Sequence, residues 1–330
     1  MKALKITVIV LLSTIAVVLI IAFFLPEEVT VSQSEIIEAK PAVVFRQVNS
    51  MQNYTKWSPF EDDSTMVSTY EGPAMGVGSV RIWEGEKVGK GSLEIIESVP
   101  YSKVVNLVKF DPSGIAEETW TFEAVDQGTN VTWSLRVYDL SYPMGRLFGY
   151  FIDDMMGPMQ KKGLDNLKSL CEAMPSPPDI EIVDVNTTPS LIIYDSTTVS
   201  GIGGLLEKNY GMLMQYIMKN KIQMAGAPFA IYHNWDPEGI IRISAGIPVA
   251  QEVAGKGLIQ YYEIPAGKAV FTEHVGGYNT EVTHYAIDDY LKDFNLKTAD
   301  YIWEAYITDP SEEPDSTKWV TYIYYPMAEE

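Results

Sequence analysis

The first hydrophobic feature of the chain is one uninterrupted apolar run at Ile6–Leu25. It holds about 20 residues without a charge, and a helix of that length, rising 1.5 Å per residue, matches a hydrocarbon core of about 30 Å. Lys2 and Lys5 precede the run, whereas Glu27 and Glu28 follow it. By the positive-inside rule, the N-terminus is cytoplasmic and the rest of the chain lies outside the cell membrane.

Two other interpretations of this run are a cleaved secretion signal and a buried core helix. The apolar part of a signal peptide has roughly 7–15 residues and ends at a small-residue cleavage site. This run is longer, and no such site follows Leu25. A buried helix of this length without a polar face is rare. The sequence therefore favours an uncleaved, single-pass transmembrane signal anchor over residues 1–28.

Downstream, over residues 29–172, short runs rich in β-branched and aromatic residues predict an antiparallel sheet. A short helical segment is expected at Ala42–Ser50 and a longer one at Pro143–Leu170, where Gly157-Pro158 should kink or break the helix. The pattern predicts a curved sheet closed over a C-terminal helix. The predicted strands read VTVSQSEIIEA, SVRIWEG, SLEIIESV, KVVNLVKF, ETWTFEAV and NVTWSLRVY.

A linker at residues 173–179 holds three prolines, which favour an extended spacer, so we place a domain boundary there. Residues 180–330 contain two similar units, each a helix with 3.6-residue periodicity followed by two strands. Asp236-Pro237 and Asp309-Pro310 mark equivalent turns, and Asn279-Thr280 offers N-cap chemistry for the second helix. The repeat predicts a pseudo-twofold α+β domain of the type (βαββ)2, with a groove where the halves meet.

Composition and charge exclude several classes of function. The 330 residues include 24 basic and 44 acidic side chains, which gives a formal net charge of −20. A surface this negative repels phosphate backbones, so nucleic acid is not an expected partner. Cys171 is the single cysteine, and His233, His274 and His284 lack the spacing of zinc or iron motifs. We expect neither a metal nor a cofactor.

One carboxylate lies among the aromatic residues of the second repeat. On a strand ending at Tyr306, alternation places Ile302, Glu304 and Tyr306 on one face and Trp303 on the other. If Glu304 is buried, desolvation should raise its pKa, and a cation or a hydrogen-bond donor must keep it ionised. A carboxylate among aromatic rings suits organic cations. A glutamate satisfied by a tyrosine hydroxyl such as that of Tyr306, with no ligand, is the simpler interpretation from these residues alone.

The first domain carries several motifs in one order: Pro41–Phe45, Tyr54–Phe60, Gly76–Ser79, Trp83–Gly85, Gly89–Ile95 and Lys162–Lys168. This order resembles the polyketide cyclase/START-like (SRPBCC) superfamily. The resemblance implies a helix-grip antiparallel sheet with an apolar cavity that carries lipids, binds hormones or performs ring chemistry in different members, and it does not choose among these functions. Aromatic residues on strands are more often core than pocket, so we assign four tryptophans to the core: Trp57, Trp83, Trp120 and Trp133.

The second domain carries Gly246–Val249, Ile264–Ala269, His274–Tyr278, Trp303–Tyr306 with Asp309-Pro310, and Ile323–Pro326. These motifs resemble the effector-binding domain shared by gyrase-inhibitor-like proteins and the drug-sensing halves of some transcription activators of the AraC type. The resemblance implies that Glu304 is the central acid of a pocket. Candidate ligand-binding residues around it are Trp303, Tyr306, Tyr278, Tyr324, Phe229 and Tyr232. No helix-turn-helix accompanies the domain here.

Three hypotheses for the function follow. The first is a membrane-anchored, non-catalytic protein that captures apolar or cationic organic ligands. The second, which the resemblance to gyrase-inhibitor-like proteins implies, is a hydrolase of electrophilic small molecules, with Glu304 as general base or nucleophile and Tyr306 or Tyr278 as proton donor. The third is a structural role in which both domains dock onto envelope partners. We expect the first, with a small ligand and the membrane as the partners.

Overall fold

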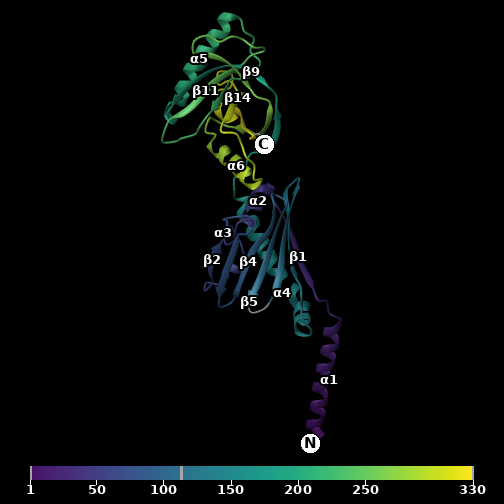
Figure 1. The fold of residues 1–330 in the computed structure, drawn as a ribbon. Helices are drawn as coiled ribbons and strands as arrows, with labels where there is room; N and C mark the ends of the chain where they lie inside the picture. Colours follow the sequence, from purple (N-terminus) through teal and green to yellow (C-terminus); the bar gives the residue numbers. More distant parts are fainter. Residues whose placement is uncertain (1, 112–113, 329–330) are drawn as a thin grey trace. The chain divides into compact units, whose positions relative to one another are not determined.

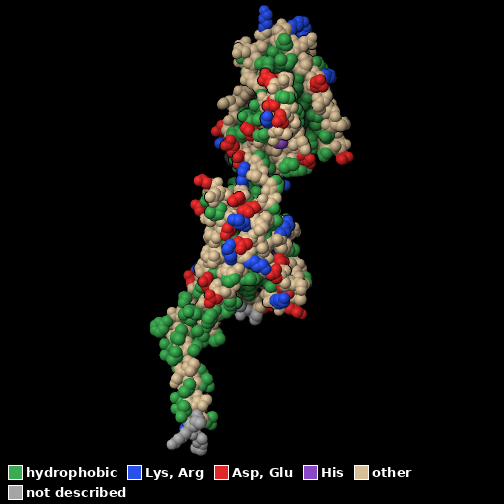
Figure 2. All heavy atoms as spheres, turned by 180° about the vertical axis from the view of Figure 1, so that it is seen from behind, with side chains coloured by type: hydrophobic (Ala, Val, Ile, Leu, Met, Phe, Trp, Pro, Cys, Tyr) green, Lys and Arg blue, Asp and Glu red, His purple; other side chains and the backbone are tan. Residues whose placement is uncertain are grey.

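The computed structural model describes residues 2–111 and 114–328. The chain divides into two compact units, Met1–Ser176 and Pro177–Glu330, here called the first and the second domain. Helix α1 spans Lys2–Phe24, and its segment Leu4–Phe24 has a mean hydropathy of 3.0 and is almost entirely exposed. Hydrophobic side chains cover this helix on the face shown in Figure 2. By length and composition α1 is able to cross a membrane.

The first domain is a seven-stranded antiparallel sheet in the order β1-β7-β6-β5-β4-β3-β2 (Figure 1). Its strands are β1 Val29–Ile37, β2 Val67–Glu71, β3 Val80–Gly85, β4 Gly89–Val99, β5 Lys103–Asp111, β6 Ile115–Val125 and β7 Gly128–Val137. Its helices are α2 Pro41–Val48, α3 Met51–Tyr54, the 3-10 turn η1 Pro59–Asp62 and α4 Met144–Glu172. Sequential strands joined by hairpins build most of this sheet, and β1 closes against β7.

Helix α4 packs on one face of this sheet and closes the core. Gly163 allows the close approach, because a Cβ there would lie 2.7 Å from the Trp133 ring. Trp57, Trp120 and Trp133 are fully buried, as we expect for core residues, whereas Trp83 is partly buried against the same cluster. Tryptophan burial thus supplies much of the apolar area that holds the helix to the sheet.

Helix α4 continues through Gly157-Pro158, so the expected break of the helix at this point is wrong. Proline removes one backbone donor, but packing on both sides of the step holds the helix together. Ile152 before the step is buried, and so is Gln160 after it. The Gln160 amide donates to the carbonyls of Val31 and Trp133, at 3.3 and 3.2 Å, and fixes the helix on β1 and β7.

The second domain is one eight-stranded antiparallel sheet in the order β12-β9-β11-β10-β14-β15-β13-β8. Its strands are β8 Ile180–Val185, β9 Thr188–Thr197, β10 Phe229–Tyr232, β11 Ile241–Pro248, β12 Ile259–Ile264, β13 Gly267–Val275, β14 Ile302–Tyr306 and β15 Val320–Pro326. Its helices are α5 Ile202–Asn220, α6 Glu281–Asp293 and the 3-10 turns η2 Val199–Gly201 and η3 Ser316–Lys318. The predicted α+β class and the two helix-then-two-strand repeats are confirmed.

The strand order displays the pseudo-twofold relation directly. Strands β9, β11 and β10 of the first half mirror β13, β15 and β14 of the second, and β10 pairs with β14 at the centre. The leading strand of each half is exchanged, since β8 pairs with β13 and β12 pairs with β9. The residues of β14 therefore lie at the middle of the sheet, where the two halves meet.

Candidate functional site

Glu304 lies near the middle of the central strand β14. It is opposite Ala230 of β10 and Ile323 of β15, and only 5% of it is exposed. Tyr232 is opposite Ile302 in the same ladder, so alternation places Tyr232, Glu304 and Tyr306 on one face. Thr280, the residue before α6, and His284 on α6 also reach this face, because both hydrogen-bond to the Glu304 carboxylate.

The Glu304 carboxylate accepts hydrogen bonds from four side chains. Thr280 Oγ1 and His284 Nε2 lie 3.0 Å from Oε1. The Tyr306 and Tyr232 hydroxyls lie 3.1 and 3.3 Å from Oε2. A buried carboxylate requires such donors, and here two come from the sheet and two from the start of α6.

His284 extends the network away from the carboxylate. An ionised carboxylate only accepts, so His284 Nε2 carries the proton that faces Glu304. On the other side of the ring, Nδ1 lies 2.9 Å from the Tyr325 hydroxyl. Glu304 therefore fixes the tautomer of a neutral His284, in which Nδ1 accepts from the Tyr325 hydroxyl. Tyr325, His284 and Glu304 thus form one chain of hydrogen bonds.

The pKa of Glu304 follows from a competition between burial and these donors. Burial raises the pKa, but the hydrogen bond and charge of His284 and the hydrogen bonds of Thr280 and Tyr306 lower it by more, so it lies below its ordinary value. The expected rise of the pKa is therefore wrong, because the donors outweigh desolvation. Burial and the nearby Glu304 charge raise the pKa of the Tyr232 hydroxyl. The site holds an ionised acid beside neutral phenols.

This lowered pKa predicts a pH-dependent stability. The ionised Glu304 carboxylate stabilises the folded state. This stabilisation is complete above pH 4.5, the ordinary carboxyl pKa, and it is lost as the pH falls through the lower pKa of the folded state. We expect the unfolding free energy of the second domain to fall in acid. His284→Ala should raise the folded-state pKa and flatten this dependence. Chemical denaturation of the full chain between neutral and acid pH tests this, and the same pH slope in both proteins would contradict it.

Aromatic rings lie on the outer side of the carboxylate. Tyr278, which is 51% exposed, contacts the Tyr306 ring at 5.4 Å and the Trp319 ring at 4.8 Å between centroids. Tyr210 of α5 contacts Tyr306 at 6.5 Å. Tyr278 follows Gly276, whose φ of +144° lies in a region that favours glycine. The exposed ring of Tyr278 therefore packs edge to face against Tyr306, a direct partner of Glu304.

Three of the predicted site residues lie on the opposite face of the sheet. Trp303 and Tyr324 are cross-strand partners, and their rings stack at 4.7 Å with an interplanar angle of 14°. Phe229 is opposite Ala305 and belongs to the same hydrophobic cluster as Trp303. The structure therefore brings Tyr232, Tyr278 and Tyr306 together with Glu304, and it does not bring Trp303, Tyr324 or Phe229 to that carboxylate.

Sequence reasoning missed Thr280, His284 and Tyr325 as members of this network. Thr280 is the N-cap residue of α6, but its hydroxyl makes no cap hydrogen bond and donates to Glu304 instead, so the expected side-chain cap is wrong. The available signal was helical spacing. His284 lies four residues after Thr280 and three before the buried Ile287, which places all three on the inward face of the helix.

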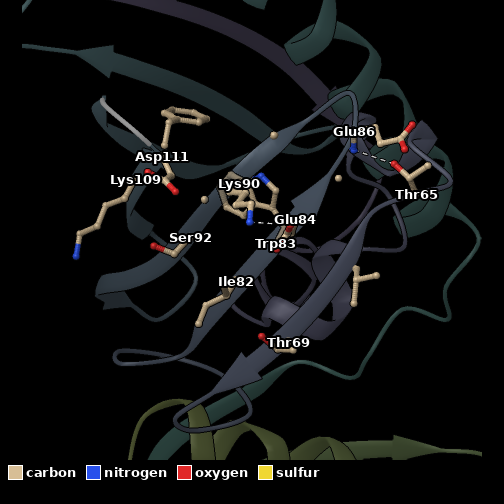
Figure 3. Close-up of a pocket in the computed structure, with 15 residues that line it drawn as sticks. Thr65, Thr69, Ile82, Trp83, Glu84, Glu86, Lys90, Ser92, Lys109 and Asp111 are labelled. Carbon is tan, nitrogen blue, oxygen red and sulfur yellow. Dashed lines mark hydrogen bonds and ion pairs between the residues drawn. The ribbon is translucent and has the colours of Figure 1, made fainter.

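A broad hollow of about 1100 Å³ lies elsewhere, over the β2–β5 part of the first sheet. Figure 3 shows Thr69, Ile82, Ser92 and Lys109, which are neighbours across these four strands. In the next row, Lys90 and Glu84 form an exposed ion pair at 2.7 Å. None of the predicted ligand-binding residues lines this hollow. Within residues 2–111 and 114–328, no group of three or more His, Cys, Asp or Glu side chains is arranged to hold a metal ion.

Fold and site together define a class of protein: an apolar N-terminal helix, a helix-closed antiparallel sheet, and a pseudo-twofold sheet domain with a buried acid. Residues 28–172 match the family described as polyketide cyclase / dehydrase and lipid transport. Residues 178–328 match the GyrI-like small molecule binding domain. Each domain therefore matches one family model, and the two matches follow the order that the sequence predicts.

Several solved structures resemble part of the chain. Protein CV1439 from Chromobacterium violaceum is 17% identical, covers 44% of this chain and 99% of its own, and gives a TM-score of 0.35. The EcmrR C-terminal domain is 18% identical, with 46% and 99% covered and a TM-score of 0.42. A hydrolase encoded by lin2189 from Listeria innocua is 11% identical, with 46% and 93% covered and a TM-score of 0.35. No curated protein matches the chain.

Proposed function

We propose that this chain is a membrane-anchored small-molecule-binding protein that captures apolar or cationic organic ligands at Glu304. In this proposal α1 is a signal anchor with a cytoplasmic N-terminus, and both domains lie on the outer side of the membrane. The family of the second domain supports small-molecule binding. The apolar helix at Leu4–Phe24 supports the anchor.

The observation that carries the proposal is a buried, ionised carboxylate among phenol rings. Glu304 is 5% exposed, and its pKa lies below its ordinary value. Tyr232, Tyr278 and Tyr306 provide ring faces close to that charge. Organic cations gain both from ring faces and from the opposite charge. A ligand reaches Oε2 by displacing the exposed ring of Tyr278 and exchanging with a tyrosine hydroxyl.

A matched pair of probes tests the role of the charge. The full chain in lipid nanodiscs is titrated calorimetrically with benzyltrimethylammonium and with neopentylbenzene, which has the same shape without the charge. We expect saturable binding of the cation and an affinity at least about tenfold lower for the neutral probe, as the gain from ring faces and charge predicts. Equal affinities, or no saturable binding of the cation, would refute the cation site.

A hydrolase is the second candidate, and one distance favours it. The Tyr306 hydroxyl lies 3.1 Å from Glu304 Oε2, which puts a proton donor and a base within hydrogen-bond reach of each other. In this alternative Glu304 acts as base or nucleophile on an electrophilic ligand. Product formation by the wild-type chain, abolished in Glu304→Gln, separates the hydrolase from the binding protein.

A further inference from the structure

The first half of α4 exposes an apolar stripe to the surroundings. Met144, Phe148, Phe151 and Met155 follow the spacing i, i+4, i+7, i+11, which places them on one face of the helix. Their exposed fractions are 72%, 49%, 53% and 53%, and Tyr150 nearby is 67% exposed. Isolated exposed apolar residues are ordinary, but a contiguous stripe of large side chains marks an interaction surface. We call these four residues the α4 stripe.

The α4 stripe begins beside the C-terminal end of α1. The Tyr142 hydroxyl donates to the Leu19 carbonyl at 3.1 Å, and Arg146 Nη1 donates to the Phe23 carbonyl at 3.0 Å. The rings of Tyr142 and Phe23 meet edge to face. These contacts join the start of α4 to the last turns of the apolar helix.

These contacts also set the depth of α4 relative to a membrane. Leu19 lies five residues before Phe24, which at 1.5 Å per residue is about 7 Å from the end of α1. Tyr142 then lies at the level where aromatic side chains collect at a membrane surface. Helices that lie in this layer bury their apolar face about 5–10 Å into the headgroup and acyl boundary.

The neighbouring charges indicate how a lipid surface is bound. Arg146 pairs with Glu27, just beyond the apolar helix. Asp153 and Asp154 are exposed beside the α4 stripe. Negative charges here do not attract anionic lipids, so the binding energy comes from apolar burial. A zwitterionic surface fits this arrangement.

We propose that the α4 stripe inserts into the outer leaflet of the membrane and holds the first domain against the lipid surface. The proposal rests on the membrane anchor proposed above, because α1 supplies the lipid phase beside which α4 begins. Met144, Phe148, Phe151 and Met155 replace water by acyl chains in this arrangement. The first domain is then fixed at the bilayer by two helices.

A site-specific fluorophore tests the insertion on the full chain. The one native cysteine, Cys171, is buried, and burial raises the pKa of its thiol to about 12, so it reacts poorly with maleimides. Phe148→Cys and, independently, Phe151→Cys are labelled with an environment-sensitive dye and reconstituted into phosphatidylcholine vesicles. Val67→Cys on β2, where Val67 is 68% exposed, is the matched control. Brominated acyl chains and aqueous iodide are the two quenchers.

We expect brominated lipid to quench the dye at positions 148 and 151 several-fold more than at position 67, and iodide to show the reverse order. Flotation of the vesicles is measured on the same samples. If the chain floats but the dye at 148 and 151 is as open to iodide as at 67, the insertion is refuted and the anchor stands. Self-quenching between labelled chains without lipid quenching identifies a second copy as the partner and refutes insertion. A chain that does not float refutes the anchor and the insertion together.

Discussion

Replacing Trp57 with alanine is expected to lower the unfolding free energy of the first domain by about 3–5 kcal/mol, the usual cost of removing a buried tryptophan. Trp57 is fully buried, and its ring contacts Trp120 and Trp133 at 5.3 and 6.2 Å between centroids. Its indole nitrogen donates to the main-chain carbonyl of Gln47 at 3.1 Å. The substitution therefore removes the packing of the turn after α3 against β6 and β7 and leaves a buried acceptor unpaired.

Calorimetric unfolding of the full chain measures this effect. Trp235→Ala is the control, because Trp235 is 60% exposed in the second domain. Only the transition of the first domain should move in Trp57→Ala, and Trp235→Ala should shift neither transition by more than about 0.5 kcal/mol. A loss below about 1 kcal/mol in Trp57→Ala would show that the aromatic core repacks around the vacated volume.

The second large effect is expected at Glu304. Glu304→Gln should weaken binding of benzyltrimethylammonium by about 30-fold, equivalent to roughly 2 kcal/mol for a charge paired with a desolvated cation. The amide keeps the size of the side chain and still accepts from Thr280 and His284, so the fold is retained. The affinity for the neutral isostere should change little, because that probe carries no charge.

The matched control is Glu273→Gln, which removes an exposed carboxylate from β13 of the same sheet. Like Glu304→Gln, it removes one negative charge from the protein, so it separates long-range attraction from local binding. A 30-fold loss in Glu304→Gln with no change in Glu273→Gln supports the site. Equal losses in the two variants would mean that the cation responds only to the overall negative charge.

Part of the fold was predictable because the pattern of apolar residues within one segment indicates its secondary structure. The apolar run at Ile6–Leu25 and the inward stripe of α5, with Leu206, Leu213 and Ile217, predict helices, and both helices are present. The exchange of β8 and β12 between halves was not predictable, because strand patterns report which residues face the core but not which strand is the neighbour. The continuity of α4 through Pro158 was not predictable either, because it depends on tertiary contacts such as the hydrogen bonds of Gln160 to β1 and β7.

The site was predictable in part. Strand alternation predicts that Glu304 and Tyr306 share a face, and in the structure the Tyr306 hydroxyl lies 3.1 Å from Glu304 Oε2. Aromatic content alone could not separate Trp303 and Tyr324, which stack on the other face, from Tyr232. Residues His284 and Thr280 come from α6, and their approach to β14 depends on how the helix packs on the sheet.

The exchanged edge strands of the second domain make the two repeats depend on each other for folding. Because β8 completes the sheet beside β13 and β12 completes it beside β9, neither repeat closes its own border. A chain cut between the repeats would leave bare strand edges on both pieces, which favours aggregation over independent folding. A single repeat of this design buries its strand edges only when it pairs with a second copy, and two repeats in one chain make that pairing intramolecular.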